Sequence, residues 1–98
     1  MIYYDPVIRS FHDRGTENLF HRQASRRLAN IARVALRRLR LLNRARTLND
    51  LRVPPGNHLE ALKGGREGQF SIRINDQYRI CFRWEAGDAY DVELTDYH

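Results

Sequence analysis

The spacing of the hydrophobic residues changes halfway along this chain, and this change restricts its possible folds more than any other feature. In the first half, apolar residues three or four positions apart define one face of a helix expected over residues 25–43: Leu28, Ile31, Ala35, Leu39 and Leu42. From residue 59 onward, apolar and polar residues alternate, which is typical of strands with one buried face. The sequence therefore predicts a helical layer followed by a sheet.

A turn-forming segment separates the two halves. Residues 53–57 read Val-Pro-Pro-Gly-Asn, and proline disfavours both a helix interior and a central strand, so we predict a rigid connector there. Strands are expected after it at residues 59–63, 70–74, 78–83 and 89–94, with turns at 75–77 and 85–88. Such short connections favour an antiparallel meander.

The N-terminal residues complete an α+β fold class. Residues 7–11 are expected to form a first strand, and Thr16 is expected to cap a short helix that ends near Phe20. Thr47 is expected to cap a turn over residues 48–51. A chain of 98 residues has the size of one domain, so we assign residues 1–98 to a single unit in which a strand and two helices pack on an antiparallel sheet.

The charge of the chain points to a polyanionic partner. Its formal net charge is +5, and all but one of its 17 basic residues are arginine, which binds phosphate through a planar fork. The exception is Lys63. Residues 18–49 hold nine arginines and no acidic residue, whereas residues 84–98 hold five acidic and no basic residues. This segregation predicts two surfaces of different charge.

Several features indicate a cytoplasmic protein. No run approaches the ~20 apolar residues that span a membrane, and the first residues do not resemble a signal peptide. The single cysteine, Cys81, lies in an apolar strand pattern and is expected to be buried in the core. Because the four histidines lack the spacing of metal ligands, we expect chemistry without a metal or cofactor.

Cations in the second half can form a phosphate-binding surface. Arg73 and Arg79 are expected on adjacent strands, where both alternate with apolar residues and so face away from the core. Lys63 is expected to end the preceding strand, and Arg66 lies in a glycine-rich loop that allows close approach of a ligand. A solvated strand face is the alternative interpretation of the same spacing.

The long helix carries a second cationic pattern. Arg33, Arg37, Arg40 and Arg44 are spaced by four, three and four residues, so they share one helix face. No acidic residue in the same helix relieves their repulsion, which indicates a docking surface for a polyanionic partner such as RNA. An ordinary solvated helix face is the alternative interpretation.

The last three residues, Asp96, Tyr97 and His98, can all take part in proton transfer. Histidine titrates near neutral pH, and a cationic pocket would lower the pKa of Tyr97 from its ordinary value of about 10. Asp96 is expected to orient one of the other two. The alternative is a frayed tail, but the strand pattern continues to Leu94 and argues against it.

Three segments, at residues 50–64, 69–84 and 96–98, together resemble the HigB-type toxins of the RelE/ParE superfamily from bacterial type II toxin–antitoxin systems. The resemblance implies a microbial-RNase-like fold and a ribosome-dependent endoribonuclease (mRNA interferase) that inhibits translation. It also implies a HigA-like antitoxin with a helix-turn-helix domain, and contact with operator DNA only through the toxin–antitoxin complex.

The resemblance also implies roles for particular residues. Arg79 matches an arginine that contacts the scissile phosphate, Arg73 and Lys63 match cationic cleft positions, and residues 96–98 match a catalytic triplet. Some members carry a histidine where this chain has Glu60; His58, expected on the same strand face, or Glu60 itself is a candidate to replace it. The alternatives are a ParE-like gyrase inhibitor and a non-catalytic nucleic-acid-binding module, neither of which needs the terminal triplet for catalysis.

Overall fold

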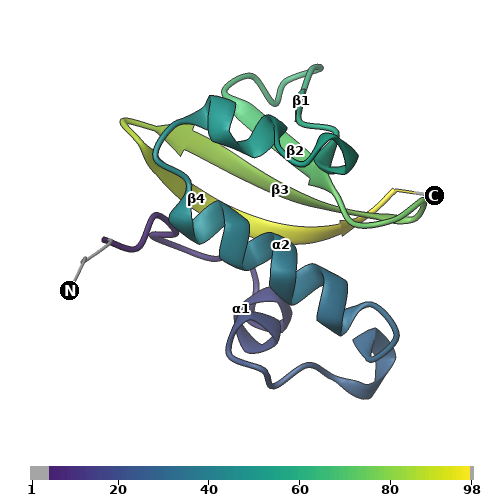
Figure 1. The fold of residues 1–98 in the computed structure, drawn as a ribbon. Helices are drawn as coiled ribbons and strands as arrows, with labels where there is room; N and C mark the ends of the chain where they lie inside the picture. Colours follow the sequence, from purple (N-terminus) through teal and green to yellow (C-terminus); the bar gives the residue numbers. More distant parts are fainter. Residues whose placement is uncertain (1–4, 98) are drawn as a thin grey trace.

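A computed structural model describes residues 5–97 as an α+β structure in which two helices pack on a four-stranded antiparallel sheet (Figure 1). The helices are α1 (Arg14–Phe20) and α2 (Ala32–Arg44). The strands are β1 (Glu60–Ala61), β2 (Gln69–Arg73), β3 (Tyr78–Glu85) and β4 (Asp88–Asp96). They pair in the order β1-β2-β3-β4, which confirms the predicted meander.

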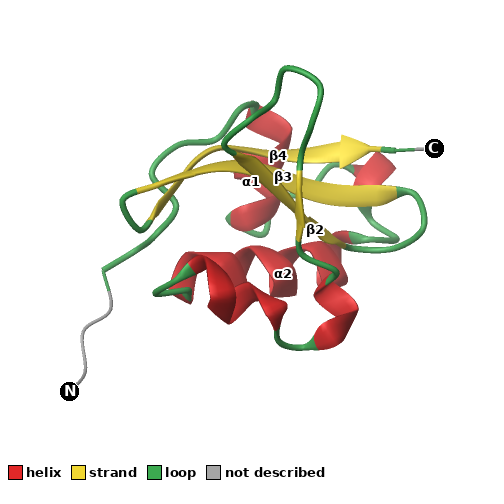
Figure 2. Ribbon diagram, turned by 90° about the horizontal axis from the view of Figure 1, so that it is seen from above, coloured by secondary structure: helices red, strands yellow, loops and turns green. Residues whose placement is uncertain are grey.

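The core lies between α2 and one face of the sheet (Figures 1 and 2). All five apolar residues of the predicted helix face are at most 4% exposed, as are Ile72, Ile80, Phe82 and Val92 on the sheet. Burying a large aliphatic or aromatic side chain contributes roughly 1.5–3 kcal/mol. The helical spacing therefore correctly predicted which residues form the helix side of the core.

The predicted helix over residues 25–43 is divided in two. Ser25 precedes a short 3₁₀ helix, η1 (Arg26–Leu28), and α2 begins only at Ala32. Neither η1 nor α2 has an acidic residue in its first turn, and the Ser25 side chain makes no capping hydrogen bond. Arginines near a helix N-terminus oppose the helix dipole, which explains why this stretch does not extend α2.

The helix α1 ends at Phe20 as predicted, but its cap is Asp13 and not Thr16. The Asp13 carboxylate accepts the Thr16 amide at 2.7 Å, and a carboxylate also complements the positive end of the helix dipole. Thr16 lies inside the helix, where its hydroxyl accepts the Leu94 amide at 2.9 Å. The threonine therefore attaches α1 to β4.

The expected strand at residues 7–11 is replaced by two isolated parallel bridges, from Ile8 to Ala89 and from Phe11 to Val92. The Asn43 side chain on α2 accepts the amides of Val7 and Ile8 at 3.1 and 3.0 Å. The ladder with β4 is interrupted between the two bridges at Asp91, which has a φ of 54° and donates its amide to the Ser10 hydroxyl at 2.8 Å. The strand β4 itself extends two residues further than expected.

The connector between the two halves contains two 3₁₀ turns, η2 (Leu48–Arg52) and η3 (Pro55–Asn57). The first follows Thr47 as expected, but the second shows that this segment can form a helical turn, contrary to the prediction. Asn57 is fully buried, and its side-chain amide donates to the carbonyls of Leu51 and Val53, both at 3.2 Å. The predicted first sheet strand shortens to two residues because His58 adopts a left-handed conformation.

Both turns predicted within the meander are present. The Asn75 side chain accepts the amides of Gln77 and Tyr78, each at 2.8 Å, and Ala86 and Gly87 form the second turn with positive φ. None of the helices between residues 5 and 97 is long and apolar enough to cross a bilayer.

Candidate functional site

The face of the sheet turned away from α2, here called the open face, carries the predicted cations. Residues that oppose each other on antiparallel strands project to the same side. The register pairs Arg73 with Arg79, and Ser71 with Cys81, while Ile72 pairs with Ile80 in the core. Arg73 and Arg79 therefore share the open face, as the alternation predicted, and the register adds that they are direct cross-strand partners.

Arg79 is held firmly on this face. Its Nε donates to the Ser71 hydroxyl at 2.8 Å, and its Nη2 donates to the backbone carbonyls of His58 and Ser71. The Glu60 carboxylate lies 4.0 Å from Nη2. With 15% of its side chain exposed, Arg79 presents a fixed and partly desolvated positive charge, which interacts with an anion more strongly than a charge in bulk water.

Tyr97 lies over the open face from the end of β4. Its hydroxyl is 3.5 Å from the Cys81 sulfur, and its amide donates to the Gln77 carbonyl. The hydrogen bond with Cys81 and partial burial raise the pKa of Tyr97, although the charges of Arg66 and Arg79 act in the opposite direction. The expectation that a cationic pocket lowers this pKa is wrong, because the contact with the thiol outweighs the nearby charges.

Cys81 is buried as predicted, but its position differs from the expectation. It lies on the open face beneath Tyr97 and outside the main apolar cluster. On β4, Glu93 lies directly opposite Cys81, and its carboxylate oxygen Oε2 is 3.8 Å from Nε2 of His12.

The remaining predicted cations are less closely associated with Arg79. Arg66 donates through Nε and Nη2 to the Gln69 side chain, and its charge acts on Tyr97. Arg73 pairs with Asp76 in the following turn. Lys63 does not end a strand, because β1 stops at Ala61 and the lysine lies in an exposed loop.

Asp96 and Tyr97, the two described residues of the terminal triplet, lie at successive positions whose side chains point to different sides of the sheet. Asp96 opposes Tyr78, so strand alternation directs it away from the face that carries Arg79. Its carboxylate accepts the Gln77 side-chain amide at 3.1 Å. His98 lies outside the described residues. The Tyr97 hydroxyl contacts Cys81. The role expected of Asp96, to orient Tyr97 or His98, stays a prediction.

The candidates to replace the absent histidine are also separated. Glu60 opposes Ser71 and lies near Arg79, with 62% of its side chain exposed. His58 is not on a strand, so the expectation that it shares a strand face with Glu60 is wrong. Its contribution to the site is the backbone carbonyl that Arg79 binds.

Ser71 was missed from the sequence. A lone serine between Phe70 and Ile72 resembles an ordinary strand residue, and only its position two residues before Arg73 places it on the same face. Within residues 5–97, no three histidine, cysteine or acidic side chains lie close enough to hold a metal ion.

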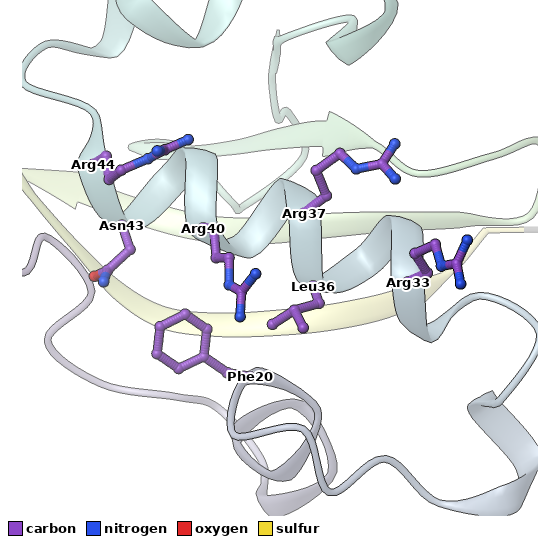
Figure 3. A pocket seen from close by; sticks show the side chains of 7 residues that line it. All are labelled: Phe20, Arg33, Leu36, Arg37, Arg40, Asn43 and Arg44. Carbon is purple, nitrogen blue, oxygen red and sulfur yellow. The ribbon is translucent and has the colours of Figure 1, made fainter.

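A second cationic surface lies on α2, and it is here called the arginine groove (Figure 3). Its volume is about 600 Å³, and it is lined by Phe20, Arg33, Leu36, Arg37, Arg40, Asn43 and Arg44. The four predicted helix arginines are thus brought together, and no salt bridge among the described residues involves them. By contrast, Arg83 on the open face is paired with Glu85 and Asp91.

Comparison with known proteins gives one consistent family. Residues 9–98 match the model for the HigB-like toxin, a RelE-like toxin of type II toxin–antitoxin systems. Toxin HigB-1 from Vibrio cholerae is 38% identical over 86 residues, which cover 86% of this chain and 90% of that protein. Endoribonuclease HigB from Proteus vulgaris is 48% identical over 40 residues, which cover 41% and 44% of the two chains.

A basic α+β protein with this family match is a RelE-like toxin of a type II toxin–antitoxin system. More specifically, the chain belongs to the HigB-like toxin family. Membership implies an antitoxin as its partner.

Proposed function

We propose that this toxin is an endoribonuclease that cuts mRNA on the ribosome and thereby stops translation. The observation that carries the proposal is the geometry of Arg79, a fixed guanidinium on an open face with the Tyr97 hydroxyl nearby. The name of the Proteus vulgaris relative, an endoribonuclease, supports the same activity. We also propose that the α+β fold of this chain has the microbial-RNase-like architecture.

The reaction proposed is an in-line attack by the ribose 2′-oxygen on the adjacent phosphorus. The bond from phosphorus to the 5′-oxygen breaks, which leaves a 2′,3′-cyclic phosphate and a 5′-hydroxyl. Arg79 donates hydrogen bonds to the phosphate oxygens as negative charge grows on them, and a well-placed donor of this kind contributes about 3 kcal/mol. Arg66, Arg73 and Lys63 bind flanking phosphates.

Proton transfer completes this reaction. The Tyr97 phenol, whose pKa is raised by its contact with Cys81 and by partial burial, is assigned the role of acid toward the leaving 5′-oxygen. Glu60, beside Arg79, or His98 takes the proton from the 2′-hydroxyl. Asp96 is assigned to holding the end of β4 through Gln77.

The arginine groove is proposed to grip ribosomal RNA, since its charges have no acidic partner among the described residues. The antitoxin is proposed to carry a helix-turn-helix domain, so that operator DNA is bound through the complex alone. This activity belongs in the cytoplasm, where ribosomes translate.

The test compares Arg79→Ala with Arg83→Ala in a translating extract, with mRNA cleavage followed by primer extension. Arg83 lies on the same strand and face but is neutralised by Glu85 and Asp91, so it is a matched control. We expect Arg79→Ala to slow cleavage about 100-fold or more and Arg83→Ala to leave it near the original rate. Unchanged cleavage by Arg79→Ala would refute the site, and DNA damage without mRNA cleavage would indicate a gyrase inhibitor.

A further inference from the structure

The hydroxyl of Ser71 is a buried polar group that is hydrogen-bonded to the guanidinium of Arg79. Ser71 is fully buried on β2, and its Oγ accepts Nε of Arg79 at 2.8 Å. Its backbone carbonyl accepts Nη2 of the same arginine at 3.4 Å. A buried hydroxyl that lacks a partner is costly, so this serine favours one orientation of the guanidinium.

A second acceptor for Arg79 comes from the connector. The His58 carbonyl accepts Nη2, and the left-handed conformation of His58, with φ of 43°, directs this carbonyl toward the sheet. The turn before it is anchored by Asn57, whose buried amide donates to two backbone carbonyls. The carbonyl is therefore held by the folded connector.

These contacts occupy one edge of the guanidinium. Arginine has five N–H donors on three nitrogens, and here Nε and Nη2 are bonded within the protein. Across residues 5–97, no group accepts a hydrogen bond from the third nitrogen, Nη1. The donors of Nη1 remain available to a ligand.

We propose that Ser71 is a positioning residue, which together with the His58 carbonyl fixes Arg79 so that Nη1 is presented to the RNA phosphate. This inference rests on the proposed mRNA cleavage and adds how its central arginine is oriented. Without the hydroxyl, Nε loses its acceptor, and the guanidinium can turn away from the productive geometry. Positioning of this kind affects the rate of the chemical step more than it affects binding.

The kinetic test measures cleavage of ribosome-bound mRNA by Ser71→Ala. We expect kcat to fall about tenfold while KM changes less than twofold. Ser10→Ala is the matched control, because the Ser10 hydroxyl also accepts one hydrogen bond, from the Asp91 amide at 2.8 Å, but lies away from Arg79. Unchanged kcat for Ser71→Ala, or an equal loss for Ser10→Ala, would overturn the proposal.

A second pair separates the hydroxyl from packing. Ser71→Thr and Ser71→Val have nearly the same shape, but only the threonine retains the acceptor for Nε. We expect Ser71→Thr to cleave about tenfold faster than Ser71→Val, and equal rates would contradict the positioning role. If Ser71→Ala fails to fold, this pair of variants still tests the positioning role.

Finally, NMR of the Arg79 Nε–H group tests the geometry without any RNA. We expect this proton to exchange slowly with water in the original protein and at least tenfold faster in Ser71→Ala. Equal exchange in both would overturn the inference whatever the cleavage rate. If the exchange changes as expected but the original protein cleaves no mRNA on ribosomes, the orientation stands and the proposed function fails.

Discussion

At the scale of single residues, the chemistry of Tyr97 depends on one contact. Two arginines near its phenol favour ionisation, yet the hydrogen bond with Cys81 and partial burial raise its pKa. A phenol that stays protonated can give a proton to a leaving group, whereas a phenolate would accept one. The thiol of Cys81 therefore favours the protonated form of the Tyr97 phenol against the pull of the two arginines.

Replacing Cys81 with alanine should lower the pKa of Tyr97 toward or below its ordinary value. The variant removes the largest contribution that raises the pKa but leaves Arg66 and Arg79 in place. Titration of the protein with ¹³C-labelled tyrosine, followed by NMR, measures this shift. Ser10→Ala should leave the Tyr97 titration unchanged, and an unchanged pKa in Cys81→Ala would contradict the role assigned to the thiol.

Asp50 makes stability depend on pH in acid. Hydrogen bonds from the backbone amides of Thr47 and Arg46 lower its pKa from 3.8. Because the folded pKa lies below the unfolded one, the ionised carboxylate stabilises the fold above about pH 4, and this contribution is lost as pH falls through the folded pKa. We expect Asp50→Ala to unfold at lower urea than the original protein at pH 7, with the difference disappearing near pH 2. An equal difference at both pH values would contradict this account.

At the scale of elements, capping determines where the helices begin. The short helix α1 has a carboxylate cap at Asp13, whereas the basic start of the predicted long helix lacks one and forms η1 before α2. The basic residues at this start are Arg26 and Arg27 of η1, which lie outside the arginine groove, and positive charge at a helix N-terminus is unfavourable.

Removing the α1 cap should destabilise the protein. Asp13→Ala loses the bonds to the Thr16 amide and hydroxyl, and losing such a cap costs about 1 kcal/mol. Urea unfolding measures the free energy of unfolding, with the exposed Asp5→Ala as a control for charge. If both variants are equally stable, the cap contributes nothing.

At the scale of the whole molecule, the sheet lies between two cationic surfaces. The open face carries Arg79, whereas α2, which covers the other face, carries the arginine groove (Figures 1 and 3). This arrangement allows one surface to hold the ribosome while the other contacts the mRNA, and it predicts that binding and cleavage respond to different mutations.

The double variant Arg37→Gln/Arg40→Gln should weaken ribosome binding and reduce its salt dependence. Each phosphate contact contributes about 0.7–0.9 to the slope of log affinity against log salt, so losing two should reduce the slope by up to ~2. Cleavage at saturating ribosomes should stay near the original rate. The exposed pair Arg14→Gln/Arg52→Gln is the control, and an equal loss there would mean that total charge, and not the groove, determines binding.

The sequence by itself determined the α+β class, the helix face of the core, the meander and the placement of Arg73 and Arg79 on one face of adjacent strands. These follow from the two hydrophobic periods and from short turns, which are local properties. Only the tertiary structure decided that Ser71 and the His58 carbonyl hold Arg79, that Cys81 lies under Tyr97 and that Asp96 faces Gln77. Such contacts join residues far apart in the chain, and their geometry depends on where β1 begins, where β4 ends and how the connector folds.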